Sequence, residues 1–197
     1  MSHTPNYRKA TNAAYRLLAK RKNLTLATNV LAIAEESLGN CVVITYGQAC
    51  YLYGFTLELL LKTSEYGFSF IRGERRIILY NESAPLGCIR FTVAHEIGHA
   101  VLGHLDEDDP GAEREANCFA RNLLCPVPVV YGLDLNDPQE FVHVFTVSEK
   151  MAVVTLNWTK TDKYYIEDDL WEQIFDMFME CIENYNASGQ QGLEVAS

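Results

Sequence analysis

The feature that most constrains this chain is an apolar segment at residues 90–104, RFTVAHEIGHAVLGH, with ionisable side chains at its centre. Residues four apart lie on the same face of a helix, so a helix here places His95 beside His99. Glu96 lies about 100° further round the helix. Burying two histidines and a carboxylate is costly unless hydrogen bonds or a metal ion satisfy them. The segment therefore predicts a buried helix organised around a polar site.

The pattern of His95, Glu96 and His99 indicates a zinc site. Two imidazoles and one oxygen ligand suit zinc, and three protein ligands leave a fourth position for water. Zinc lowers the pKa of that water to about 7, and Glu96 is placed to accept its proton. The alternative interpretation is a pair of core histidines satisfied by hydrogen bonds.

The third ligand is expected from a second helix, predicted at residues 112–124 (AEREANCFARNLL). On a helical wheel Glu113 lies at the edge of the apolar face, with Asn117 one turn further on. Glu113 is therefore the preferred third ligand, and Asn117 is expected to orient a ligating histidine from behind. Glu115 falls on the far side and is the fallback ligand. The acidic loop at residues 106–110 (DEDDP) is interpreted as solvated surface, although one of its carboxylates is a further alternative.

Composition indicates one globular core with an uneven charge. The chain has 197 residues, 48% of them hydrophobic, and a net charge of −10. Residues 1–104 carry 11 Lys and Arg against 7 Asp and Glu, whereas residues 105–197 carry 5 against 19. The acidic second half argues against nucleic-acid binding by that half, and we expect no direct nucleic-acid partner.

Several features point to a cytoplasmic protein. No stretch approaches 18 uninterrupted apolar residues, which excludes a transmembrane helix, and MSHTPNYRKA lacks the apolar region of a secretory signal. The six cysteines have no C-x-x-C spacing, so we expect buried reduced thiols rather than a disulfide framework.

Periodicity and capping residues divide the chain into a core and a helical extension. We expect a core that carries the zinc site at residues 1–130, a helical extension packed on it at 131–185, and a disordered tail at 186–197. Residues 47–64 are ambiguous between helix and strand. Two short helices at 138–145 and 148–158 resemble a helix-turn-helix, which we interpret as helices packing on the core. The remaining predicted elements are strands at 41–46, 67–71 and 75–80, helices at 10–22, 25–38, 86–102 and 167–185, and a loop at 131–137.

Four motifs, in this order, resemble the ImmA/IrrE family of metallo-endopeptidases: IILYNESAP (77–85), RFTVAHEIGHAVLGH (90–104), EREANCFARNLLCP (113–126) and FTVSEKMAVVTLNW (145–158). The resemblance covers roughly residues 25–158. It implies an α+β fold: a mainly helical, gluzincin-like zinc-metallopeptidase core, a small mixed or antiparallel sheet beside the H-E-x-x-H helix, and a helical C-terminal part.

By position, the resemblance implies that His95 and His99 are zinc ligands, Glu113 the third ligand and Glu96 the catalytic base. One departure is minor, since Cys125 stands where the family usually has a methionine in an L-L-M-P-like run. A metzincin would need a glycine and a histidine three and six residues after His99. Leucines occupy both positions, so His104 is not a metzincin ligand.

The leading functional hypothesis is a zinc-dependent intracellular endopeptidase that cleaves a regulatory protein, such as a helix-turn-helix repressor. The alternative is a non-catalytic, zinc-stabilised regulator that binds a protein partner; a DNA-binding regulator ranks third. Peptide hydrolysis would need a second oxyanion donor, for which His104, His143 and Tyr131 are candidates. His104 is equally a candidate for supporting a metal ligand from behind. The oligomeric state is left open.

Overall fold

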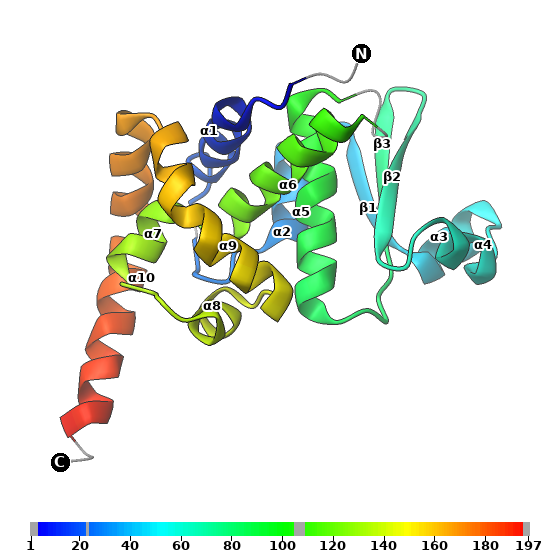
Figure 1. Cartoon of the computed structure of the whole chain (residues 1–197). Helices are drawn as coiled ribbons and strands as arrows, with labels where there is room; N and C mark the ends of the chain where they lie inside the picture. Colours follow the sequence, from blue (N-terminus) through cyan, green and yellow to red (C-terminus); the bar gives the residue numbers. More distant parts are fainter. Residues whose placement is uncertain (1–3, 23, 105–108, 195–197) are drawn as a thin grey trace.

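The structure is a computed structural model that describes residues 4–22, 24–104 and 109–194 (Figure 1). Helices dominate it, and a small sheet lies near one end. The elements in chain order are α1 (Tyr7–Leu18), α2 (Val30–Ser37), β1 (Cys41–Thr45), α3 (Tyr46–Tyr53), α4 (Leu57–Thr63), β2 (Gly67–Arg72), β3 (Arg75–Tyr80), α5 (Leu86–Leu102), α6 (Pro110–Leu124), α7 (Val127–Gly132), α8 (Pro138–Phe145), α9 (Glu149–Asp162), the 3₁₀ turn η1 (Lys163–Tyr165) and α10 (Asp168–Glu194).

The sheet is mixed and has the strand order β1-β3-β2. The hairpin predicted around Gly73 is confirmed, since β2 pairs antiparallel with β3 and the register ends at Arg72 opposite Arg75. Strand β1 pairs parallel with β3, with Cys41 opposite Arg76. In the described chain β3 is therefore central, and β1 and β2 are the two edges. The α+β class expected from the sequence is confirmed.

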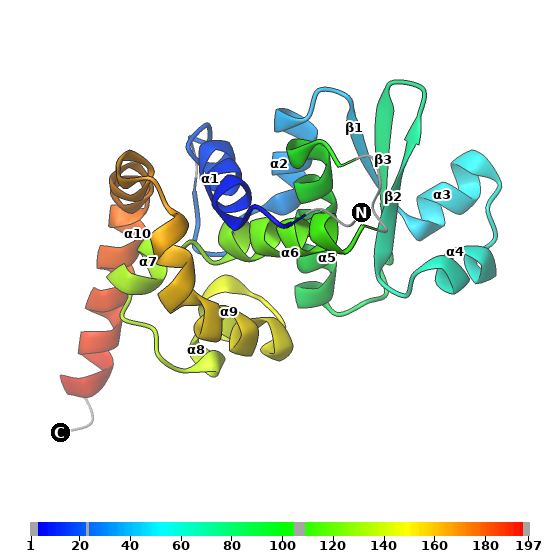
Figure 2. The ribbon, with the colours of Figure 1, turned by 45° about the horizontal axis from the view of Figure 1, so that its top comes forward.

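Helices cover both faces of the sheet, as Figures 1 and 2 show from two directions. Side chains alternate between the faces along a strand. In β3, Ile77 and Leu79 join an apolar cluster with α3 and α4, whereas Ile78 joins the main core with α5. The sheet thus separates a small outer layer from the helical body.

Helices α5 and α6 pack closely because α5 has a glycine at the contact. A Cβ atom on Gly98 would lie 3.0 Å from Cδ1 of Phe119 and 3.3 Å from the Cα of Ala116. A side chain at this position would push its neighbours on α6 away by a few tenths of an ångström, so glycine favours the close approach. This packing places the first turns of α6 beside the histidines of α5.

The C-terminal helices pack on the core. Phe141 and Phe145 of α8 and Met151 of α9 are buried in the main cluster, in agreement with the structural interpretation of these two helices. Figure 1 shows α10 running along α7. Within the described ranges, none of the helices is both long enough and apolar enough to cross a bilayer.

Four segments differ from the sequence-based expectation. Residues 47–64 form the two short helices α3 and α4, each begun by a capping threonine, Thr45 and Thr56. The chain before residue 133 is helical as α7 rather than an open loop, because Pro128 fits the first turn of a helix. Helix α1 begins earlier than expected because Asn6 caps it.

The fourth difference is the C-terminal tail. We expected residues 186–197 to be disordered, but α10 continues to Glu194. The added segment contains two glycines, which disfavour a helix, but extending an existing helix avoids the cost of nucleation. The last three residues lie outside the described chain.

All six cysteines are free, as expected. Cys118 and Cys125 are fully buried, whereas the other four are partly buried. Burial raises the pKa of the Cys118 thiol to about 11, so this group stays protonated at neutral pH.

A buried polar network joins α1, α6 and α9. Arg121 donates from Nε to Oδ2 of Asp162 (2.8 Å) and from Nη2 to Oδ1 (3.1 Å). Asn122 donates to the same carboxylate (3.1 Å) and accepts from the Tyr15 hydroxyl (2.9 Å). Asp162 is only 1% exposed, so its charge is balanced almost entirely by protein groups.

We predict that Asp162→Ala destabilises the fold by about 3–5 kcal/mol, because it leaves the buried guanidinium of Arg121 without its counter-charge. Urea denaturation followed by circular dichroism measures the loss. Asp176→Ala, which removes an exposed carboxylate from α10, is the matched control. Equal stability of the two variants would contradict this account of the network.

Candidate metal centre

Three possible ligand atoms converge where α5 meets α6. Nε2 of His99 lies 2.9 Å from Nε2 of His95 and 3.1 Å from Oε1 of Glu113. Nε2 of His95 lies 3.6 Å from Oε2 of Glu113. One cluster of the kind that can bind a metal is found in the described part of the chain. It consists of His95, His99 and Glu113, with no fourth His, Cys, Asp or Glu.

These separations fit one small divalent cation. Ligand atoms at zinc distances around a tetrahedral centre are about 3.3 Å apart. The three observed distances lie on either side of that value. The donor set of two nitrogens and one carboxylate oxygen is also one that such ions accept.

Groups behind the histidines decide which ring nitrogen carries the proton. Nδ1 of His95 lies 3.1 Å from Oδ1 of Asn117, an acceptor, so this nitrogen is the donor. Asn117 thus contacts His95, and its role in orienting this histidine stays a prediction. In the neutral ring, Nε2 of His95 is left with a lone pair facing Glu113.

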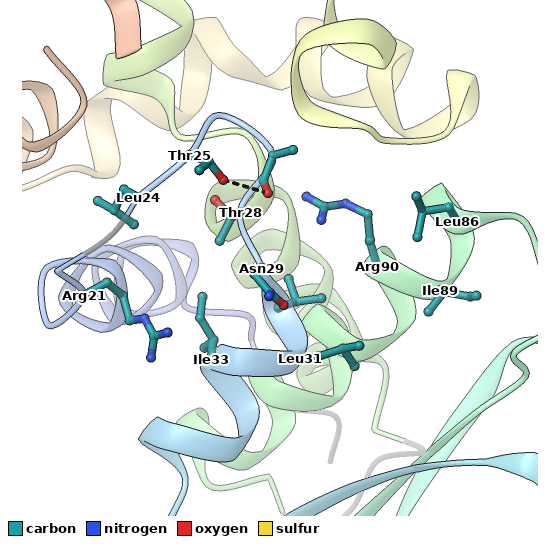
Figure 3. Close-up of a pocket in the computed structure, with 12 residues that line it drawn as sticks. Arg21, Leu24, Thr25, Thr28, Asn29, Leu31, Ile33, Leu86, Ile89 and Arg90 are labelled. Atoms are coloured by element: carbon teal, nitrogen blue, oxygen red, sulfur yellow. Dashed lines mark hydrogen bonds between the residues drawn. The ribbon is translucent and has the colours of Figure 1, made fainter. Parts of the chain in front are cut away.

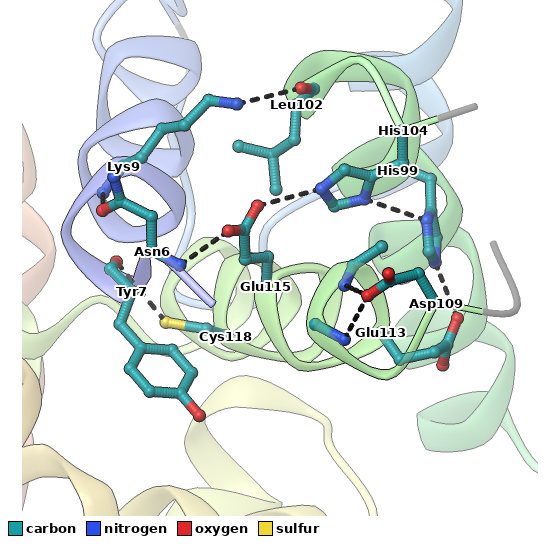
Figure 4. Close-up of polar contacts among 12 residues, drawn as sticks. Asn6, Tyr7, Lys9, His99, Leu102, His104, Asp109, Glu113, Glu115 and Cys118 are labelled. Carbon is teal, nitrogen blue, oxygen red and sulfur yellow. Dashed lines mark hydrogen bonds and ion pairs between the residues drawn. The ribbon is translucent and has the colours of Figure 1, made fainter. Parts of the chain in front are cut away.

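A longer hydrogen-bond chain acts on His99 in the same way (Figure 4). The carboxylate of Glu115 accepts from Nε2 of His104 (3.0 Å), which leaves Nδ1 of the neutral His104 ring as an acceptor. That atom lies 3.0 Å from Nδ1 of His99, so His99 donates there. Its Nε2 then carries a lone pair as well.

The Nε2 lone pairs of His95 and His99 and the carboxylate of Glu113 are therefore directed at the same small region. Two imidazole lone pairs 2.9 Å apart repel each other, and the Glu113 carboxylate adds negative charge. A cation relieves both effects. The arrangement is therefore preorganised for a metal ion, and it disfavours the interpretation of two core histidines that merely satisfy each other.

The pKa shifts of His95 and Glu113 also show that this cluster favours a positive charge. Burial alone lowers the pKa of His95, but the hydrogen bond that the protonated ring donates to Glu113 and the charges of Glu96 and Glu113 outweigh it, so the pKa is raised. Hydrogen bonds to His95 and His99 hold the pKa of the Glu113 carboxyl far below its usual range. A proton partly supplies the charge that a metal would supply.

Glu96 stands next to His95 on α5 and is 7% exposed. Its carboxylate is close enough to contribute to the raised pKa of His95. That Glu96 acts as a base beside a metal stays a prediction.

Glu115 lies on the far side of α6 from the three converging atoms, as the helical wheel placed it, but its burial was not expected. Glu115 is 2% exposed, whereas the side chain of Glu113 is 42% exposed. The reason is that α1 covers this side of α6, and the Asn6 amide donates to Glu115 (2.6 Å). Glu115 is thus held behind His104, away from the three converging atoms.

The other candidates are not brought to this site. Both ring nitrogens of His104 are engaged behind His99, so it does not face a substrate. His143 is exposed on α8, and Tyr131 contacts Trp171 in the α7–α10 region. The carboxylates of the acidic loop at residues 106–109 fall mostly outside the described residues.

A cleft of about 620 Å³ opens beside the cluster of His95, His99 and Glu113. Phe91, whose ring centroid lies 6.0 Å from that of His95, and Asn117 both line it. Four of its fourteen lining residues are aromatic, and the exposed cations Arg114 and Lys150 also line it. The full lining is Tyr7, Tyr66, Cys88, Phe91, Thr92, Arg114, Asn117, Arg121, Ser148, Lys150, Met151, Val154, Thr155 and Trp158.

Sequence reasoning missed Glu115 as a supporting group and Tyr66 and Arg114 as cleft residues. Arg114 lies between the two glutamates of α6, and a wheel that places Glu113 at the site edge also places Arg114 near it. Tyr66 carries no local signal, since it reaches the cleft only through the pairing of β2 with β3.

Comparison with protein-family models gives one match. Residues 56–157, more than half the chain, match the peptidase M78 family, described as the IrrE N-terminal-like domain. Comparison with curated proteins and with solved structures gives no significant match.

We predict that Glu115→Gln lowers metal affinity about 10–100-fold. A glutamine has one oxygen and cannot accept from both Asn6 and His104, so the proton arrangement that exposes the lone pair of His99 is lost. Competition with a chromophoric chelator measures the affinity for Zn²⁺. Glu172→Gln, an exposed site on α10, is the control, and an unchanged affinity in Glu115→Gln would contradict the role of the hydrogen-bond chain.

Proposed function

This chain belongs to the peptidase M78 family, the IrrE N-terminal-like domain, and from that membership we propose that it is a zinc-dependent endopeptidase. The observation that carries the proposal is the convergence of two imidazole lone pairs and one carboxylate on a single point beside a cleft. His95, His99 and Glu113 would hold the metal. When bound, zinc supplies a Lewis acid that polarises the scissile carbonyl and makes water acidic enough to react at neutral pH.

The protein's own groups then handle the protons. Glu96 accepts the proton of the attacking water and returns it to the leaving amine, as a general acid–base residue does. Its burial beside His95 keeps competing solvent away from the carboxylate. Asn117 and His104 hold the two histidines in fixed orientation, so little reorganisation is needed during the reaction.

The sheet offers a way to bind an extended peptide. Strand β2 is an edge in the described chain, and Tyr66, just before it, lines the cleft. A Cβ atom on Gly67 would lie 2.7 Å from Cγ2 of Thr92 on α5, so this strand starts directly against the catalytic helix. Backbone pairing with a strand edge gives affinity with little demand on sequence.

The cleft adds a side-chain preference. Its aromatic and aliphatic lining residues suit an apolar substrate residue, and Arg114 and Lys150 favour nearby acidic ones. We propose a protein substrate of regulatory type, such as a helix-turn-helix repressor, as the family resemblance implies.

The alternative of a non-catalytic, zinc-stabilised binding protein is less well supported. Structural zinc sites are normally closed by four protein ligands. This cluster has three within the described residues and lies beside a cleft. Such a site leaves room for a substrate.

We predict that Glu96→Gln lowers the rate of peptide hydrolysis at least about 10²–10⁴-fold while zinc content and protein binding persist, because only the proton acceptor is lost. The measurement maps new N-termini by mass spectrometry in cells that produce either form, and then assays the purified pair on the substrate found. Glu172→Gln controls for the change of charge. Cleavage that is equal in wild type and Glu96→Gln would assign the site to a non-catalytic role.

A further inference from the structure

A second cavity, of about 560 Å³, lies between the chain before α2 and the first turns of α5; we call it the α2 pocket (Figure 3). Leu86, Ile89 and Arg90 line it from α5. At 100° per residue these three positions lie on the face of α5 opposite to Phe91 and His95. The α2 pocket is therefore separate from the proposed substrate cleft, and none of His95, His99 and Glu113 lines it.

Two buried polar atoms in the α2 pocket lack a partner. Thr28 is 2% exposed and Arg90 is 8% exposed. Neither Oγ1 of Thr28 nor Nε of Arg90 has a hydrogen-bond partner among the described residues. Nη2 of Arg90 donates to the Phe145 carbonyl (3.2 Å), but no carboxylate of the described chain forms an ion pair with this guanidinium. Unpartnered buried groups of this kind are costly, and each calls for an explanation.

The surroundings of these atoms are positive. Figure 3 shows the Arg90 guanidinium directed from α5 toward the turn that carries Thr28. Helix α2 begins there, with Asn29 as its cap, and the first amides of a helix have no intrahelical acceptor and carry positive potential. Arg21 also lines the pocket; its partner, Glu36, is itself largely exposed.

The rest of the wall is apolar. It includes Leu24, Leu31, Ile33, Leu86 and Ile89. Such a wall would cover the body of a ligand whose charged end reaches Arg90. Inorganic ions alone would leave most of the volume to water.

We propose that the α2 pocket binds a small organic anion, whose carboxylate or phosphate head group contacts Arg90, Thr28 and the start of α2 and whose apolar body packs on the leucine and isoleucine wall. The head group accepts from the two unpartnered donors and neutralises the buried cation. The site is independent of the proposed peptidase activity.

Isothermal titration calorimetry at low ionic strength tests the proposal with four probes: phenyl phosphate, benzoate, inorganic phosphate and benzyl alcohol. We expect saturable binding of phenyl phosphate or benzoate, which identifies the head group. Inorganic phosphate and the uncharged alcohol should each bind at least about tenfold more weakly, because each lacks one half of the recognition.

Thr28→Val is the decisive variant. It keeps the shape of the side chain and removes a hydroxyl that has no protein partner, so the ligand-free variant should melt no lower than wild type. Its affinity for the anion should fall about tenfold or more. Arg21→Gln should weaken binding less and reduce its dependence on salt, whereas Arg16→Gln, which breaks the comparable pair with Glu167, should have no effect.

Two results would overturn the proposal. The first is no saturable binding of either organic anion to wild type. The second is binding that Thr28→Val and Arg21→Gln leave unchanged, which would place the anion elsewhere; its loss on removing metal with a chelator would then assign it to the metal centre.

Discussion

The hydrogen bonds from Glu115 through His104 to His99 are the interaction on which the candidate centre depends. They decide that the proton of His99 lies on Nδ1, behind the site, and that the lone pair on Nε2 faces Glu113. Asn117 does the same for His95 from the other helix. Without these supports, the two rings could share a proton across their 2.9 Å contact and would no longer require a cation.

The packing of α1, α6 and α9 around α5 holds these residues in place. Gly98 lets α6 approach α5, which brings Glu113 to the two histidines, and α1 covers α6 from the other side and encloses Glu115. The buried Arg121–Asp162 pair then ties α9 to α6, which fixes the far wall of the cleft. Helix α5 carries His95 and His99 on one face and Arg90 on the opposite face, so one rigid element borders both the cleft and the α2 pocket.

Local patterns predicted much of this, and contacts between distant segments account for the rest. The limits of α5, Leu86–Leu102, follow from its own composition and from the stop at Gly103. The grouping of His95, His99 and Glu113 follows from spacing together with the amphipathic pattern of α6. The burial of Glu115 depends on Asn6, more than a hundred residues away, and no property of α6 alone reveals it. Helices α3 and α4 were ambiguous because their sequences are apolar on most sides and are decided by their caps and by the sheet they cover.

The central claim is that His95, His99 and Glu113 together hold one zinc ion. The most direct measurement is metal content by inductively coupled plasma mass spectrometry on purified wild type and on His99→Ala after both are equilibrated with zinc. The account predicts about one zinc per chain in wild type, as an open three-ligand site requires, and almost none in the variant. Equal zinc in the two proteins, or none in either, would contradict it.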